Sequence, residues 1–146
     1  MAWSLNSYEQ YIYSIASLSP HIQASNLVLI RRGKFLAELE GSIVFASNIT
    51  LEVREFLYFL SPEFIRRYGY LVKKDSDVLY WYDSQPHPNN PALQSTHPHH
   101  KHVPPDIKHN RIPAPELSFY EPNLTFLIHE IEGLFFSNKP TSTEII

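Results

Sequence analysis

Apolar side chains near the start of the chain recur at three- and four-residue steps, which is the spacing of one face of an α-helix. The positions are Leu5, Tyr8, Ile12, Ile15 and Leu18. Asn6 and Glu9 have the three-residue separation of a capping box, and Pro20 follows the last apolar position. The pattern therefore predicts an amphipathic helix over residues 5–18.

After residue 26 the pattern changes to short apolar runs separated by turn residues. The runs cover residues 27–31, 35–40, 42–47 and 50–58, with Arg32-Gly33 and Gly41 between the first three. Runs of this length bounded by glycine predict β-strands. In the last run Leu51, Val53 and Leu57 share one face of a strand, although the same segment also fits a helical period.

A hairpin is predicted from residues 68–73 and 78–83, because a polar four-residue turn joins these two runs. Beyond the hairpin, nine of the twelve prolines fall between Pro86 and Pro122. This density predicts a Pro/His-rich loop over residues 84–121, with a short strand around 100–103 as its only regular element.

The chain ends in a second helical pattern, from about Pro122 to Leu134. Residues beyond Ser137 are predicted to form a loose tail. Together the elements predict one domain over residues 1–146 of the α+β class. We expect N- and C-terminal helices to flank an antiparallel β-meander of four to six strands and to cover one of its faces.

The composition excludes several classes of protein. With no cysteine in 146 residues, the chain has neither a disulfide framework nor thiolate metal ligands. No apolar run approaches the ~18 to 20 residues that cross a bilayer, and the start of the chain lacks a signal-peptide pattern, so we expect a soluble cytoplasmic protein outside membranes. A net charge of −3 excludes a strongly basic nucleic-acid binder, so any contact with RNA requires a local basic patch.

Histidine is concentrated in one part of the proline-rich loop. Six of the eight histidines lie between Pro86 and Arg111, and four of them fall within the six residues from His97 to His102. Imidazole exchanges protons near neutral pH, and it is also the commonest metal ligand in proteins. The tract therefore indicates proton-transfer chemistry, metal binding or anion binding.

Cleavage of RNA needs a base, an acid and a cation beside the phosphate, and the tract contains all three. If residues 100–103 are extended, His100 and His102 project to one face and Lys101 to the other. We therefore predict a metal-independent ribonuclease without a cofactor, in which His100 and His102 exchange protons and Lys101 stabilises phosphate. The residues predicted to contact the substrate are His87, His99, Lys108, Arg111, Arg54 and Tyr82.

Two other interpretations of the tract stay open. The imidazoles could form the site of a metal-dependent hydrolase, which takes three His or carboxylate ligands and keeps one position for water. The candidate ligands are His100 and His102 with His87, His97 or Asp83, although no established motif spacing is present. Alternatively, the loop is a non-catalytic surface that docks onto a partner protein.

Two segments of the chain resemble a known family. The first is Tyr80-Trp-Tyr-Asp83-Ser-Gln-Pro-His87 continuing into Pro98-His99-His100-Lys101-His102-Val103, and the second runs from Asn123-Leu124 to Ile128-His129-Glu130-Ile131. Over residues 30–134 the sequence resembles the TumE family, the toxin components of prokaryotic toxin–antitoxin pairs. By position, the family signature falls on Asp83, His87, His99, His100, Lys101 and His102. The chain departs from the signature at Ser84-Gln85 and at Asn89-Asn90.

The resemblance implies the toxin of a type II toxin–antitoxin system, acting as a ribonuclease on RNA. Its partner would be a cognate antitoxin, often a helix-turn-helix DNA-binding protein, and a homodimer is left open. The helix-and-meander layout is also similar to RelE- and barnase-like ribonuclease folds. The departures leave the roles of residues 84–90 unassigned, whereas the tract from Pro98 to His102 is intact.

Overall fold

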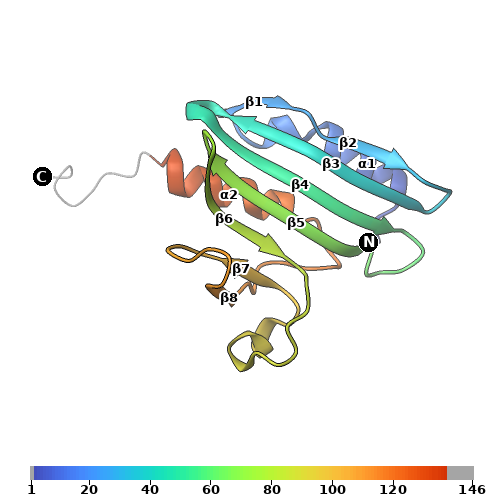
Figure 1. Ribbon diagram of the computed structural model, residues 1–146. Coiled ribbons are helices and arrows are strands. Elements are labelled where there is room, and N and C mark those ends of the chain that lie inside the picture. The colour runs from blue at the N-terminus through green and yellow to red at the C-terminus, as the bar shows by residue number, and fades with distance from the viewer. Residues whose placement is uncertain (1, 138–146) are drawn as a thin grey trace, which may run out of the picture.

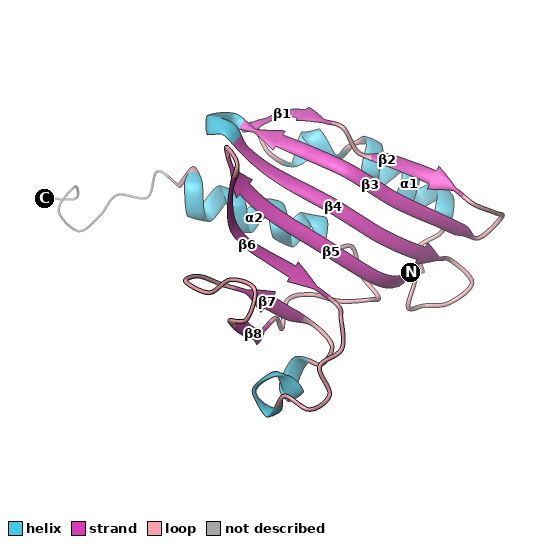
Figure 2. Ribbon diagram, in the orientation of Figure 1, coloured by secondary structure: helices cyan, strands magenta, loops and turns pink. Residues whose placement is uncertain are grey.

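The computed structural model describes residues 2–137, which form one large antiparallel sheet with a helix near each end (Figure 1, Figure 2). The α-helices are α1 (Leu5–Tyr13) and α2 (Leu124–Phe135). The strands are β1 (Ile22–Ser25), β2 (Val28–Arg31), β3 (Leu36–Phe45), β4 (Ile49–Tyr58), β5 (Ile65–Lys74), β6 (Asp77–Asp83), β7 (His100–His102) and β8 (Arg111–Pro113). Short 3-10 helices cover Ile15–Leu18, Ala46–Asn48 and Pro91–Thr96. The predicted tail after Ser137 lies outside the described residues.

Strands β3 to β8 pair in chain order, each antiparallel to the next. Strands β1 and β2 both pair with the other edge of β3, β1 beside its C-terminal part and β2 beside its N-terminal part. The sheet therefore has eight strands over the described residues, and it extends through β7 and β8 into the proline-rich segment (Figure 1).

This sheet corrects the predicted fold class. The prediction of an α+β layer on a meander of four to six strands, with a RelE- or barnase-like layout, is wrong, because the described chain is mostly an eight-stranded antiparallel sheet with small helices at its ends. Strand β1 was not predicted, because three of its four residues are exposed at the edge of the sheet and so form no apolar run. Strand β8 was not predicted, because it has only three residues and lies in a proline-rich segment.

Several single elements agree with the sequence. The helix predicted over 5–18 is present as α1 followed by a 3-10 turn, but its capping box uses Ser4 and Ser7 rather than Asn6 and Glu9. The ambiguous run 50–58 is strand β4, and the predicted hairpin is formed by β5 and β6. These elements could be predicted because the spacing of apolar and turn residues within each short segment is enough to identify them.

Gly41, predicted as a turn between two strands, lies inside the continuous strand β3. Its φ of 129° favours glycine. A Cβ atom at this position would overlap the backbone oxygen of Asn26, in the link between β1 and β2. The glycine therefore permits a close approach of two backbone segments.

Both helices cover the same face of the sheet (Figure 1). Their buried residues share one core with the inward side chains of the strands. Because side chains alternate along a strand, every second residue faces away from the helices. We call this second surface the open face, and it carries Arg54 of β4, Gly69 of β5 and Asp83 of β6 as paired neighbours.

A glutamate lies in the middle of the core. Glu55 of β4 is fully buried and accepts hydrogen bonds from the hydroxyls of Tyr8 on α1 and Tyr70 on β5. Asn123, just before α2, donates to the Tyr70 hydroxyl at 3.0 Å. Burial raises the pKa of Glu55 to about 7, and the two tyrosine hydrogen bonds oppose this shift. This network links both helices to the sheet.

Neither described helix has both the length and the apolar character that crossing a bilayer requires.

Candidate active site

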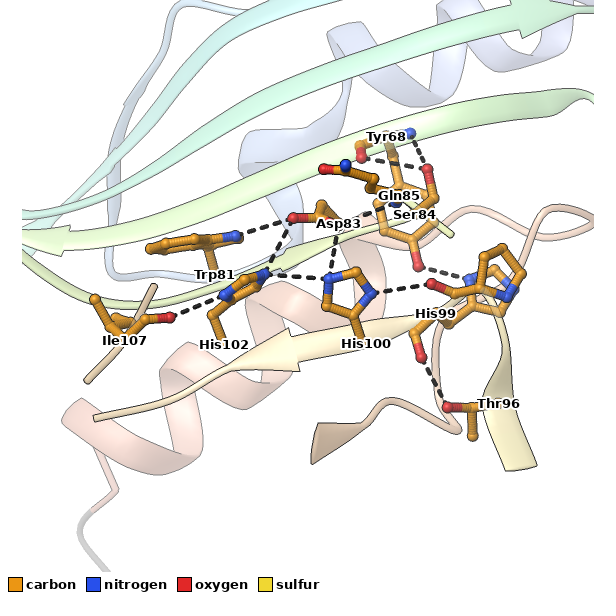
Figure 3. Close-up of polar contacts among 11 residues, drawn as sticks. Tyr68, Trp81, Asp83, Ser84, Gln85, Thr96, His99, His100, His102 and Ile107 are labelled. Carbon is orange, nitrogen blue, oxygen red and sulfur yellow. Dashed lines mark hydrogen bonds and ion pairs between the residues drawn. The ribbon is translucent and has the colours of Figure 1, made fainter. Parts of the chain in front are cut away.

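The pairing of β6 with β7 brings Asp83, His100 and His102 together on the open face (Figure 3). The strands are antiparallel, with Asp83 opposite His100 and Trp81 opposite His102. Residues two apart on a strand share a face, so these four side chains form one group. We call Asp83, His100 and His102 the histidine cluster.

Three polar groups converge in the histidine cluster. The Nε2 atom of His100 lies 2.8 Å from Oδ1 of Asp83, and Nε2 of His102 lies 3.3 Å from Oδ2. The two Nε2 atoms are 3.1 Å apart. Both histidines are buried, whereas the Asp83 side chain is 23% exposed. The carboxylate therefore forms the accessible side of the cluster.

A backbone carbonyl holds the other nitrogen of each ring. Nδ1 of His100 lies 3.1 Å from the Pro98 oxygen, and Nδ1 of His102 lies 2.8 Å from the Ile107 oxygen (Figure 3). A carbonyl oxygen only accepts, so each Nδ1 carries the hydrogen. In a neutral ring Nε2 is then an acceptor, and both Nε2 atoms point at each other and at the carboxylate.

Burial and hydrogen bonds set the protonation of this cluster. Burial alone would raise the pKa of Asp83, but a hydrogen bond from His100, which its Nε2 donates only when the ring carries a second proton, acts together with the Gln85 amide and Trp81 and lowers the pKa to about 2. Burial also lowers the pKa of His102, although the Ile107 carbonyl and the Asp83 charge act in the opposite direction. Near neutral pH the cluster thus combines an ionised carboxylate with a neutral imidazole at position 102.

Trp81 is a neighbour of the cluster to which the sequence assigned no role there. Its Nε1–H donates to Oδ2 of Asp83 at 3.1 Å, and its ring stacks on His102 with 4.0 Å between centroids. The Gln85 amide donates to Oδ1 of Asp83 at 3.0 Å. The carboxylate is therefore fixed from two sides. The available signal was the alternation that puts Trp81 and Asp83 on one face of a predicted strand.

His87 and Arg111, both predicted to contact substrate, border the cluster. The His87 ring meets the His100 ring edge-on, with 4.8 Å between centroids. Arg111 lies opposite His102 in the pairing of β7 with β8, and its buried Nε has no hydrogen-bond partner among residues 2–137. Burial, followed by the charge of Arg111, lowers the pKa of His87. Arg111 thus adds a cation beside the cluster.

Lys101 and Tyr82 lie apart from the cluster, on the face covered by the helices. The Lys101 ammonium donates to Oε2 of Glu130 on α2 at 3.2 Å and lies over the rings of Tyr80 and Tyr82. The Tyr82 hydroxyl donates to the same carboxylate oxygen at 2.7 Å. These contacts attach β6 and β7 to α2, on the opposite side of the sheet from His100 and His102.

The remaining predicted residues lie further from the cluster. The His99 ring stacks on Tyr68, whose hydroxyl is 2.5 Å from Nδ1 of His99. His97 and Lys108 are exposed on loops. Arg54 is on the open face two strands away from Asp83, with Gly69 between them.

A bulge between β4 and β5 puts two arginines in succession near the cluster. The register shifts after Phe56, so Arg66 is an extra residue before Arg67, and both are exposed. Arg67 lies 3.8 Å over the Phe56 ring, and Arg66 lies 5.7 Å over the Tyr58 ring. Both arginines line a hollow of about 570 Å³ that reaches Asp83. Basic and aromatic groups thus adjoin the accessible side of the cluster.

The fold and the site define a small antiparallel β protein with one aspartate and two histidines gathered towards one edge of its sheet. The family model described as Toxin TumE matches residues 12–135, a range that includes the whole cluster. The chain therefore belongs to the TumE family of toxins. No curated protein and no solved structure matches it.

Proposed function

We propose that this toxin cleaves RNA and that the histidine cluster is its catalytic centre. The observation that carries the proposal is the convergence of two buried imidazole Nε2 atoms on the Asp83 carboxylate, which itself lines a hollow together with two arginines. Membership of a toxin family supports an activity that harms the cell. Cleavage of a phosphodiester is chemistry for which imidazoles and arginines are suited.

The roles of the side chains follow from the bonds that change. A hydroxyl oxygen attacks phosphorus and gives up its proton. The bond from phosphorus to the 5′ oxygen then breaks, and that leaving oxygen takes up a proton. An unprotonated Nε2 of the cluster accepts the first proton, and water supplies the second to the leaving oxygen. Arg111 offsets the charge that develops on the phosphate.

The separation of the two imidazoles changes the roles expected from the sequence. An acid and a base that serve one phosphate stand on opposite sides of it, whereas the two Nε2 atoms are 3.1 Å apart. No phosphate fits between atoms at hydrogen-bond distance. We therefore assign His100 and His102 to the same side of the reaction, together with Asp83. Lys101, which is bound to Glu130, has no part in the catalytic step.

The partner and the location belong to the same proposal. Family membership supports a cognate antitoxin that neutralises the toxin. We propose that this antitoxin is a helix-turn-helix protein and that both act in the cytoplasm, where the RNA substrate is found.

The proposal is tested by incubating the purified protein with a structured RNA, with His102→Gln and His109→Ala as variants. His109 is the matched control, because it pairs with Asp106 at the surface, where the two side chains are 66% and 64% exposed. We expect the control to cleave like the unaltered protein and His102→Gln to lose at least about 100-fold in rate. Circular dichroism verifies that each variant is folded. Growth inhibition by a protein that cleaves no RNA would contradict the proposal and favour a docking function.

A further inference from the structure

We infer that the histidine cluster binds a divalent transition-metal ion of the zinc type, through Nε2 of His100, Nε2 of His102 and a carboxylate oxygen of Asp83. This departs from the metal-independent mechanism preferred from the sequence, and it narrows the metal-binding alternative that the sequence left open to one set of ligands, with Asp83 rather than His87 or His97 as the third. As a binding site, the cluster stands on its geometry alone. As a cofactor for RNA cleavage, the ion rests on the proposed function. With the ion bound, neither Nε2 could also accept a proton, and a metal-bound water would supply the base in its place.

The first argument is the number of acceptors that meet at one point. The carbonyl oxygens of Pro98 and Ile107 keep the ring hydrogens of the neutral imidazoles on Nδ1, so both Nε2 atoms present lone pairs whenever the rings are neutral. These lone pairs face each other across 3.1 Å and also face the Asp83 carboxylate. Acceptors at this distance repel unless a cation lies between them. One proton joins a single pair of atoms in a straight hydrogen bond, whereas a metal ion binds all three groups.

The second argument is the spacing of the ligand atoms. Bonds of about 2.0–2.1 Å from a tetrahedral zinc ion put neighbouring ligand atoms roughly 3.3 Å apart. The two Nε2 atoms are 3.1 Å apart, and they lie 2.8 and 3.3 Å from different oxygens of the Asp83 carboxylate, Oδ1 and Oδ2. With one ligand atom taken from each residue, the three atoms all lie within 4.8 Å of one another. No other group of three His, Asp or Glu side chains within residues 2–137 brings its ligand atoms this close. The ligand atoms are thus already near the spacing that an ion requires.

The third argument is the set of contacts around the ligands. Metal-bound histidines commonly donate their second N–H to a backbone carbonyl, as both rings do here. Trp81 donates to the carboxylate and stacks on His102, which restrains both ligands. Two neutral imidazoles and one carboxylate suit Zn²⁺ and leave a fourth position for water or a phosphate oxygen.

The test is metal binding by the whole chain after treatment with a chelator. Calorimetric titration with Zn²⁺ measures affinity and stoichiometry, and the visible absorption of bound Co²⁺ reports the coordination. We expect one ion per chain for the unaltered protein and for His109→Ala. Asp83→Asn and His102→Gln should bind at least about 100-fold more weakly.

Two results would overturn the metal site. The first is an unaltered protein that binds no stoichiometric ion. The second is an equal loss of binding in His109→Ala and in the ligand variants, which would mean adventitious chelation by exposed histidines. If a ligand variant does not fold, ¹⁵N NMR of the unaltered protein decides. We expect Nδ1-protonated rings at His100 and His102 without metal and a shift of both Nε2 signals with Zn²⁺, and unshifted signals would reject the site.

Assays of RNA cleavage on the same samples separate this inference from the proposed function. Binding of Zn²⁺ without cleavage would reject the ribonuclease and leave the metal site in place. Cleavage by a chelator-treated protein that binds no metal would reject the metal site and leave the ribonuclease in place.

Discussion

The carboxylates of Asp83, which is partly buried, and Glu55, which is fully buried, differ in protonation because burial and hydrogen bonds balance differently at the two sites. The pKa of Asp83 falls to about 2, because indole and amide donors, together with the His100 ring when it is protonated, outweigh its burial. The pKa of Glu55 rises to about 7, because complete burial outweighs two tyrosine hydroxyls. Near neutral pH the first is an ionised site residue, and the second titrates inside the core.

Replacing Glu55 with Gln tests this titration. The folded protein holds a proton on Glu55 up to about pH 7, whereas the ordinary pKa of the side chain is 4.5. Between these values the folded state binds more protons than the unfolded state, so the free energy of unfolding should fall as pH rises, by up to about 1.4 kcal/mol per pH unit. Below this range the contribution is fully present. Glu55→Gln should remove the fall, as measured by urea unfolding at several pH values.

The comparison with Glu55→Gln isolates one group from all others that titrate. Tyr8 from α1 and Tyr70 from β5 face the carboxyl, and burial raises the pKa of both phenols well above the ordinary value. They therefore stay protonated across the range. Parallel pH profiles in the two proteins would show that Glu55 does not titrate there.

Trp81→Phe tests the hydrogen bond that fixes the Asp83 carboxylate. Phenylalanine keeps a ring to stack on His102 and removes the indole N–H that donates to Asp83. We expect Zn²⁺ affinity to fall by about 10–100-fold without loss of the fold, as measured by calorimetry. Trp3→Phe is the matched control, because Trp3 donates to Glu121 far from the site. Equal affinities in the two variants would contradict a positioning role for Trp81.

At the scale of elements, sequence patterns predicted the parts whose signal is local. Helical spacing located α1 and α2, and the polar turn located the hairpin of β5 and β6. Alternation also predicted that His100 and His102 share one face, with Lys101 on the other. Asp83 was one of three candidates for a third ligand beside His100 and His102, but alternation could not select it over His87 and His97, because its convergence depends on the register of β6 with β7 across the intervening loop. Likewise, the need for glycine at position 41 follows from the close approach of the Asn26 backbone, which the sequence pattern does not reveal.

Lys101→Met tests whether the Lys101 side chain holds strand β7 to α2 or instead contacts the substrate. Methionine keeps the apolar stem over Tyr80 and Tyr82 but removes the ion pair with Glu130, in which the side chains are 19% and 15% exposed. The free energy of unfolding should fall by about 1–3 kcal/mol, because a largely buried carboxylate loses a charged partner. RNA cleavage per folded molecule should persist.

Denaturant unfolding and RNA cleavage are measured side by side for this variant. Lys108→Met serves as the control, because Lys108 is exposed on its loop and should change stability little. If Lys101→Met keeps its stability but no longer cleaves RNA, Lys101 stabilises phosphate, as the sequence suggested.

At the scale of the whole molecule, charge is distributed unevenly over the open face. Away from the cluster, cations are paired with acids, as in Lys73 of β5 with Glu52 of β4 at 2.7 Å and Arg32, after β2, with Glu38 of β3 at 2.8 Å. Near the cluster, Arg66 and Arg67 contact aromatic rings and have no carboxylate partner among the described residues. A chain with a net charge of −3 thus carries a local basic region beside its candidate site.

The double variant Arg66→Ala, Arg67→Ala tests this region as a contact for RNA. We expect weaker binding of single-stranded RNA and a salt dependence whose logarithmic slope is smaller by about 0.7 for each phosphate that the variant no longer neutralises. Fluorescence anisotropy at several salt concentrations measures both quantities. Arg31→Ala is the control, because Arg31 pairs with Glu9 of α1 at 2.9 Å. An unchanged slope in the double variant would exclude these arginines from RNA binding.

The position of β7 in the sheet has a consequence for the order of folding. Short connections join β3, β4, β5 and β6, so these strands pair with near neighbours in sequence. Pairing of β7 with β6 must instead close the segment 84–99 and order its prolines, which costs chain entropy. We expect the central sheet to form first and the histidine cluster last. A newly made molecule would then pass through a folded but harmless stage, and this delay would give an antitoxin time to bind before the toxin becomes active.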